Sequence, residues 1–149
     1  MKFFPKLLPV FFIFVFFTPF SAYSSDCDDL YLKAMKGEIS SSMLDLCKKE
    51  AMDGNDKTQL ILGYMYQNGV GVTKDEKQAA DWYLRSAKAG YAMAQFNIGK
   101  MYEDGIGVKQ DYTQAVYWYK KAESLMNGKA AYALGSLYYQ GKGVRANEK

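Results

Sequence analysis

One pattern of residues returns three times along this chain, at a spacing of 36 positions. A glycine stands at Gly63, Gly99 and Gly135, a tyrosine follows each of them three positions later, and two more glycines and a valine follow within nine positions. The first two copies also share a Trp-Tyr pair, at 82–83 and 118–119. A fixed period of about 20–50 residues is typical of a solenoid, in which one small unit stacks on the next. The period therefore predicts a repeat fold, and it favours a function in binding over one in catalysis.

Each unit is expected to contain a helix, a glycine loop and a second helix. In the middle copy, apolar residues recur at helical spacing before the loop at 105–108, which indicates one apolar stripe. Gly99 lies inside this helix, where glycine costs about 1 kcal/mol relative to alanine, so its recurrence predicts close contact with the second helix. Asp111 begins that second helix as an N-cap, and Gln114 follows it as in a capping box. The expected fold class is an all-α solenoid of antiparallel helix hairpins.

The first residues are expected to be removed before the protein folds. Lys2 and Lys6 precede an apolar run over 7–17, and small and polar residues follow over 18–24. This layout is typical of a secretory signal peptide, which we place at residues 1–24. The run is short for a membrane span of about 20 residues, and an uncleaved anchor stays open as the alternative. We expect the protein to be periplasmic or secreted.

The composition of the mature chain excludes several classes of function. The 19 lysines and arginines, less Lys2 and Lys6, leave 17 basic residues against 16 acidic ones, so the net charge is near +1. Such a balance gives no basic footprint for nucleic acid, and no mature stretch is long and apolar enough to span a membrane. The chain has no histidine, which removes most acid–base catalysis and the commonest metal ligand. We expect no catalytic residue, no metal site and no cofactor.

Two cysteines, Cys27 and Cys47, remain in the mature chain. In an exported protein an even number of cysteines suggests a disulfide. Residues 28–36 and 42–52 are expected to form two short helices with a turn near 37–39, and the two cysteines lie at similar distances from that turn. They would meet in an antiparallel hairpin, so we predict a disulfide. Two buried thiols in an imperfect repeat are the alternative.

The middle copy resembles a Sel-one-like repeat. The resemblance lies in the strings AQFNIGKMYEDGIGV, at 94–108, and DYTQAVYWYKKA, at 111–122, and it extends over residues 58–147. It implies a relative of tetratricopeptide repeats, whose α-helical hairpins stack into a right-handed superhelix and whose members mostly act as adaptors and scaffolds. We expect a degenerate N-terminal helical hairpin cap at 25–57, repeats at 58–93 and 94–129, and a partial repeat at 130–149.

The same resemblance implies where a partner would bind. In the tetratricopeptide fold, the first helix of each unit lines a concave groove, at fixed positions relative to the helix glycine. The alternative is that the curvature of the superhelix buries these positions between adjacent first helices. The aromatic residues that recur between copies are expected in the core instead: Tyr66, Tyr102, Tyr138, Trp82, Trp118, Tyr83 and Tyr119. The predicted groove has a row formed by Leu60, Phe96 and Tyr132, flanked by Tyr64, Lys100 and Tyr139.

The third copy ends two residues after Asn147, before a second helix. Its first helix carries Leu134, Leu137, Tyr138 and Tyr139, and no following helix covers them. Terminal repeats normally carry a polar outer face, so we expect exposed apolar surface at this open end. Leu137 is the residue expected in an interface there, with a partner or with a second copy in a homodimer across a two-fold axis.

The expected function is that of a non-enzymatic protein–protein interaction module, an adaptor or scaffold of the bacterial cell envelope. Its partner would be another protein, bound in the concave groove as a helix or an extended segment. The resemblance leaves a second role open, that of a periplasmic immunity protein which neutralises an antibacterial effector. A β-lactamase-like hydrolase is an alternative of another class. Cysteine-rich relatives with that label carry a cysteine pair in each repeat, whereas the repeats of this chain carry none.

Overall fold

A computed structural model describes residue 27 and residues 29–125 and 127–143; the predicted signal peptide lies outside the described residues. This part of the chain is all-α, with no strand among the described residues. The helices are α1 (Leu30–Met35), α2 (Ser41–Met52), α3 (Asp56–Asn68), α4 (Glu76–Lys88), α5 (Ala92–Asp104), α6 (Tyr112–Glu123) and α7 (Gly128–Gln140).

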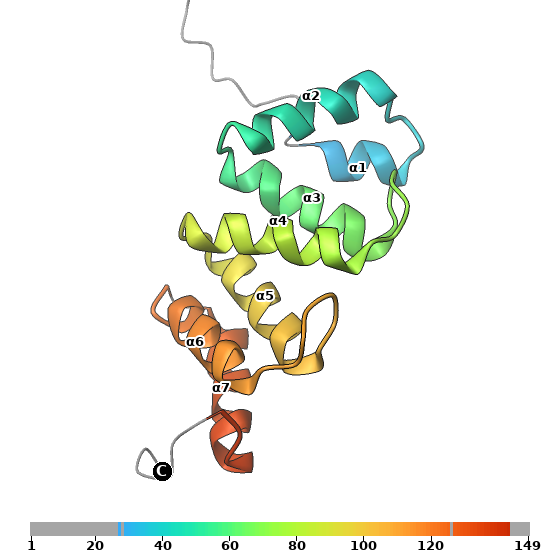
Figure 1. Ribbon diagram of the computed structural model, residues 1–149. Helices are drawn as coiled ribbons and strands as arrows, with labels where there is room; N and C mark the ends of the chain where they lie inside the picture. Colours follow the sequence, from blue (N-terminus) through green and yellow to red (C-terminus); the bar gives the residue numbers. More distant parts are fainter. Residues whose placement is uncertain (1–26, 28, 126, 144–149) are drawn as a thin grey trace, which may run out of the picture.

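The helices form hairpins that stack along one direction (Figure 1). α3 packs on α4 and α5 packs on α6, while α4 and α6 each contact the first helix of the next unit. The α1–α2 hairpin lies at one end of the stack, and α7 lies at the other. The predicted solenoid of helix hairpins is therefore confirmed.

Helix starts and ends follow the residues that recur at the repeat period. The carboxylates of Asp75 and Asp111 accept hydrogen bonds from backbone N–H groups in the first turns of α4 and α6, at 2.9–3.0 Å. Such caps satisfy donors that have no partner inside the helix. Gly69, Gly105 and Gly141 end α3, α5 and α7 in the left-handed conformation, which glycine adopts without a steric penalty. The predicted N-caps and glycine loops are confirmed.

A second glycine in each loop sets how closely successive units approach. A Cβ built on Gly107 would overlap the backbone carbonyl of Glu76, at the start of the preceding α4. A Cβ built on Gly143 would overlap the carbonyl of Tyr112 in the same way. These two loops therefore rest on the first turn of the second helix one unit earlier, whereas Gly71 of the first loop approaches the side chain of Ala34 in α1. This repeated contact holds the loops against the stack and fixes its spacing.

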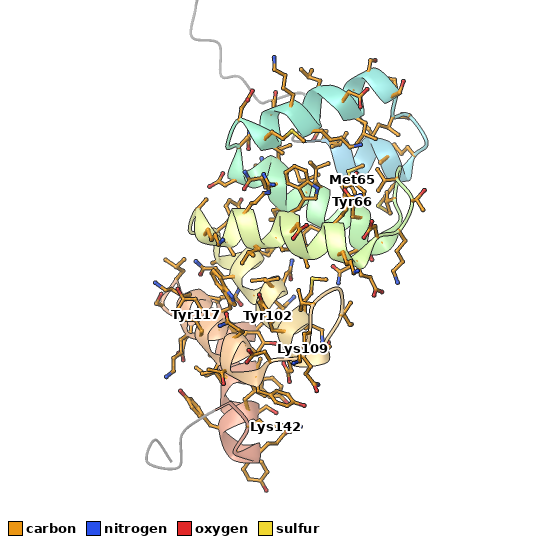
Figure 2. The ribbon with its side chains drawn as sticks, viewed as in Figure 1. Met65, Tyr66, Tyr102, Lys109, Tyr117 and Lys142 are labelled. Carbon is orange, nitrogen blue, oxygen red and sulfur yellow. A yellow bond between two sulfur atoms is a disulfide. The ribbon has the colours of Figure 1, made fainter. Side chains whose placement is uncertain are left out.

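The core runs along the stack between the two layers of helices. Of the aromatic residues that recur between copies, Tyr102 and Tyr138 are half-buried. Met65 and Tyr66 of α3 lie inside the stack (Figure 2). The prediction that the repeated aromatics form the core is confirmed for the five that are buried: Tyr66, Trp82, Tyr83, Trp118 and Tyr119.

The N-terminal hairpin is closed by a covalent bond. Cys27 and Cys47 form a disulfide with a Cα–Cα distance of 5.4 Å, and both residues are fully buried. The predicted disulfide is confirmed, and the alternative of two buried thiols is wrong. None of the described helices is long and apolar enough to cross a membrane.

Candidate functional site

A tyrosine ring covers the helix glycine in each of the first two repeats. A Cβ built on Gly99 would lie 2.8 Å from Cδ1 and Cε1 of Tyr119, and one built on Gly63 would overlap the ring of Tyr83. Real Cβ atoms do not approach other carbon atoms this closely, because the contact is far inside van der Waals distance. The predicted close approach of the second helix at these glycines is therefore confirmed.

The hydroxyl groups of the same two tyrosines are fixed by hydrogen bonds to the first helix. Tyr83 donates to Oε1 of Gln67 at 2.7 Å, and Tyr119 donates to Oε2 of Glu103 at 2.6 Å. Burial raises the pKa of both hydroxyls well above the usual value, and for Tyr119 the hydrogen bond to Glu103 raises the pKa further. Both groups therefore remain neutral donors, and their hydrogen bonds hold the second helix of each hairpin against the first.

Two adjoining cavities form a groove along the faces of α5 and α7. The larger cavity has a volume of about 970 Å³ and is lined mainly by apolar atoms, with Tyr64, Met93 and Phe96 among its residues. The smaller has a volume of about 500 Å³ and is lined by Phe96, Lys100 and Tyr132, among others. Phe96 and residues 128–129 line both cavities. We call this continuous surface the groove.

Four of the six predicted groove residues line these cavities. Tyr64 and Phe96 are half-buried on the groove floor. Lys100 is exposed and forms an ion pair of 2.9 Å with Asp104, while Tyr132 is 83% exposed. The structure thus brings these side chains onto one surface. Whether a partner binds them stays a prediction.

The two other predicted groove residues lie elsewhere. Leu60 is only 6% exposed, because α3 is enclosed by α1, α2 and α4, and its side chain joins the core. The expectation that Leu60 forms part of an exposed row is therefore wrong. Tyr139 is 94% exposed but is not among the residues that line either cavity. It lies about two helical turns beyond Tyr132 along α7.

Sequence reasoning missed groove residues in the connections between units. Tyr91 and Leu125 line the larger cavity. Tyr91 stands where the neighbouring copies have the N-caps Asn55 and Asn127, but it makes no side-chain capping hydrogen bond. Tyrosine at an N-cap position where the other copies have asparagine is the sequence signal that could have identified Tyr91 as a groove residue.

Asn97 was also missed. It lines the larger cavity, and its amide Nδ2 is buried with no hydrogen-bond partner among the described residues. An unsatisfied buried donor costs about 1–3 kcal/mol. Because this nitrogen is buried, it is not a contact that the groove presents to a partner.

The open end differs from the sequence expectation. Leu137 is fully buried and packs with Leu134 in the cluster formed with α6. The prediction of Leu137 as an exposed interface residue is wrong, because α7 packs its leucine stripe onto α6. Among the residues of α7 that are exposed instead are Tyr132, Gly135 and Tyr139.

Among the described residues, there is no metal-binding cluster: no three histidine, cysteine, aspartate or glutamate side chains lie close enough together to hold a metal ion.

The sequence model of the Sel1 repeat family matches the chain three times, at residues 57–91, 92–125 and 128–149. A region of 46 residues is 41% identical to chitin synthase regulatory factor 3 of Schizosaccharomyces pombe; it is 31% of this chain and 5% of that protein.

Solved structures with the same architecture support the match. The Sel1 repeat protein from Oxalobacter formigenes is 35% identical, with a TM-score of 0.66 over 74% of this chain and 86% of its own length. The protective antigen c5321 of uropathogenic Escherichia coli is 33% identical, with a TM-score of 0.71; the match covers 79% of this chain and 26% of c5321. Cysteine rich protein B of Helicobacter pylori shares the fold, at 23% identity and a TM-score of 0.60, with 75% of this chain and 99% of that protein covered.

Proposed function

The chain belongs to the Sel1 repeat family, and from that premise we propose that it is a non-enzymatic binding module that holds a segment of another protein in the groove. Proteins built from such repeats typically act as interaction modules and scaffolds. The observation that carries the proposal is the meeting of two cavities at Phe96, which gives a concave surface with an apolar floor. Concave apolar surfaces with a few placed polar groups are the usual form of binding sites.

The chemistry of the groove suits a polypeptide. Phe96 and Tyr64 offer aromatic surface for an apolar side chain of the partner, as aromatic residues do at the centres of interfaces. Two positive charges and one negative charge lie along the smaller cavity, on Lys100, Lys129 and Glu103. We expect the bound segment to insert one apolar side chain beside Phe96.

We further propose that the protein acts outside the cytoplasm, as an adaptor of the bacterial cell envelope. The disulfide between Cys27 and Cys47 supports this proposal, because disulfides persist in oxidising compartments. The signal-peptide layout of residues 1–24 supports it independently.

Affinity capture from an envelope extract of the native host, with mass spectrometry, tests the proposal. The mature protein is compared with Phe96→Ala and with Met93→Glu, which places a charge on the floor of the larger cavity. Tyr117→Ala is the matched control, because Tyr117 is a 48% exposed aromatic on α6 (Figure 2) and lines neither cavity. We expect one partner to be retained by the control and lost by both groove variants. Equal capture by all four proteins would contradict binding in the groove.

A further inference from the structure

The helix α1 has little of its own to hold it in place. It has only six residues, and Asp29 at its N-cap accepts no hydrogen bond through its side chain. Its buried residues are Leu30 and Ala34, and among the helices it packs mainly on α3. Isolated helices shorter than about 12–15 residues are marginal in water. The position of α1 on α3 therefore depends on how its two ends are attached.

The two ends of α1 are attached in different ways. At the C-terminal end the chain turns at 37–39 into α2, and backbone hydrogen bonds close that turn. At the N-terminal end the attachment is the disulfide between Cys27 and Cys47, which lies within α2. Without the bond, α1 is attached at one end only. The burial of two side chains then has to offset the entropy of ordering the whole segment 27–39, which fixes more than ten residues of backbone.

α1 also supports one residue of the groove. The ring centroid of Tyr31 lies 6.3 Å from that of Tyr64, and the ring of Tyr83 meets Tyr64 edge-on, with its centroid at 5.6 Å. Tyr64 is the residue through which α3 lines the larger cavity. Its ring is therefore fixed between α1 and α4, and it would lose one of these two contacts if α1 left α3.

We propose that the docking of α1 is conditional on the disulfide, and that Tyr64 is fixed in the groove only in a chain whose two cysteines are joined. A chain that folds in a reducing compartment, where thiols stay reduced, would leave residues 27–39 undocked and the groove incomplete at this end. A chain that folds in an oxidising compartment would have the complete groove. The consequence for partner binding rests on the proposed function, whereas the docking of α1 does not.

The burial of the bond means that this condition is set while the chain folds. Both cysteines are 0% exposed, and thiol–disulfide exchange requires a thiolate to reach one of the two sulfur atoms. In that reaction a dithiol supplies two electrons and two protons, the S–S bond breaks, two thiols form on the protein, and the dithiol becomes a disulfide. Because the reagent reaches the sulfur atoms only when α1 leaves α3, the folded, oxidised protein should resist reduction.

The experiment compares three forms of the mature chain, which separate the effect of the bond from that of the reagent. The first is the oxidised protein, and the second is the same protein after unfolding, reduction and refolding in dithiothreitol. The third is Cys27→Ala/Cys47→Ala, with and without dithiothreitol, in which the reagent has no bond to break. Hydrogen exchange with mass spectrometry follows peptides that cover 29–39, and peptides from α5 and α6 report on the rest of the stack.

In the oxidised protein, we expect the amides of residues 30–38 to exchange at least about tenfold more slowly than in an unstructured chain. In the reduced protein and in the double variant, the same amides should exchange no more than about twofold more slowly than in an unstructured chain. α5 and α6 should stay protected in all forms, because they pack on each other and on α4 and α7. Dithiothreitol should change nothing in the double variant.

Labelling by hydroxyl radicals tests the effect on the groove without any partner. The oxidised protein and the double variant are compared in the absence of dithiothreitol, because thiols consume the radicals. We expect the labelling of Tyr64 to rise at least about threefold in the double variant, since undocking of α1 uncovers one side of its ring. Tyr117 is the internal control, because it is 48% exposed on α6 and its labelling should stay the same.

Three results would overturn the proposal. One is a segment 30–38 that stays protected in the reduced protein and in the double variant, since packing on α3 would then be sufficient. Another is a loss of protection in α5 and α6 as well, since the whole fold would then need the bond. The third is unchanged labelling of Tyr64 in a protein whose α1 is undocked. None of these measurements uses a partner, so groove variants that fail to weaken capture would leave them unchanged, and the two proposals fail separately.

Discussion

The ring of Tyr119 occupies the space that a side chain at Gly99 would need. A Cβ built on Gly99 would lie 2.8 Å from two ring carbons of Tyr119, although the two residues are on different helices. Glycine inside a helix costs about 1 kcal/mol relative to alanine, and here that cost allows the second helix to pack directly on the backbone of the first. Gly135 has the same position in the third copy but no described neighbour within 4 Å.

This difference predicts opposite effects for one substitution at two equivalent glycines. Gly99→Leu should lower the free energy of unfolding by about 1–3 kcal/mol or more, because it overpacks the contact with Tyr119. Gly135→Leu should leave it unchanged or raise it by up to about 1 kcal/mol, because leucine is the better helix former at an exposed position. Urea unfolding followed by circular dichroism measures both. A stabilised Gly99→Leu would show that the ring does not constrain this position.

The loop glycines give a second matched pair. Gly107 and Gly90 both have positive φ, at +68° and +104°, but only a Cβ on Gly107 meets other atoms, namely the carbonyl of Glu76. Gly90→Ala should cost about 1–2 kcal/mol, the penalty of a left-handed conformation for a residue with a Cβ. Gly107→Ala should cost clearly more, because the loop must also move away from α4. Thermal unfolding of both variants checks this, and equal losses would mean that the loop does not determine the unit spacing.

These glycines show why so much of the fold could be predicted from the sequence. A residue type that is costly in a helix, or that is needed for a special backbone conformation, recurs only where geometry requires it. The repeated Gly99 therefore indicated a close helix contact, and the repeated Gly107 indicated a turn. Asp111, a preferred N-cap residue, indicated the start of a helix. The cysteine pair followed from the same hairpin reasoning. All of these are local relations within one unit or between two neighbours.

Exposure of single side chains could not be predicted in the same way. Leu60 and Phe96 hold the same position in two copies, but α3 is enclosed by the N-terminal hairpin and α5 is not, so Leu60 is buried and Phe96 lines the groove. Leu137 was expected at an exposed end, yet α7 turns its leucines toward α6 and exposes Tyr132 and Tyr139. Burial depends on which neighbour covers a position, and a repeat pattern alone does not give that.

The hydrogen bond from Tyr119 to Glu103 provides a third prediction. Tyr119→Phe keeps the ring on Gly99 but removes the donor, so it should cost about 1.5–3 kcal/mol, as expected for a hydrogen bond to a charged group. Glu103→Gln should cost less, because an amide oxygen accepts the equivalent bond from Tyr83 in the first repeat, where Gln67 stands. Denaturant unfolding of the two variants checks the order of the losses. A larger loss for Glu103→Gln would contradict it.

Reduction of the disulfide gives a fourth prediction. Cys27 and Cys47 are 20 residues apart in the sequence, and in the chain-entropy model a loop of this size contributes roughly 3 kcal/mol to stability. The melting temperature should therefore fall by several degrees in reductant. Titration of the native protein, purified from its host without reductant, should find no free thiol. Two reactive thiols in that preparation would rule out the bond under physiological conditions.

The fifth prediction separates the groove from the core by comparing the stability losses of two aromatic truncations, one at Phe96 and one at Trp118. Trp118 is 6% exposed, so Trp118→Ala should cost about 3–5 kcal/mol, as expected for a truncation in a core. Phe96 is half-buried on the groove floor and has one face against Tyr119, so Phe96→Ala should cost clearly less stability.

If Phe96 is an anchor for the partner, the same substitution should weaken binding by about 2 kcal/mol or more. Denaturant unfolding and calorimetric titration with the captured partner measure the two losses on one set of proteins. A Phe96→Ala variant that is as unstable as Trp118→Ala, and that binds the partner normally when folded, would place Phe96 in the core and remove it from the binding surface.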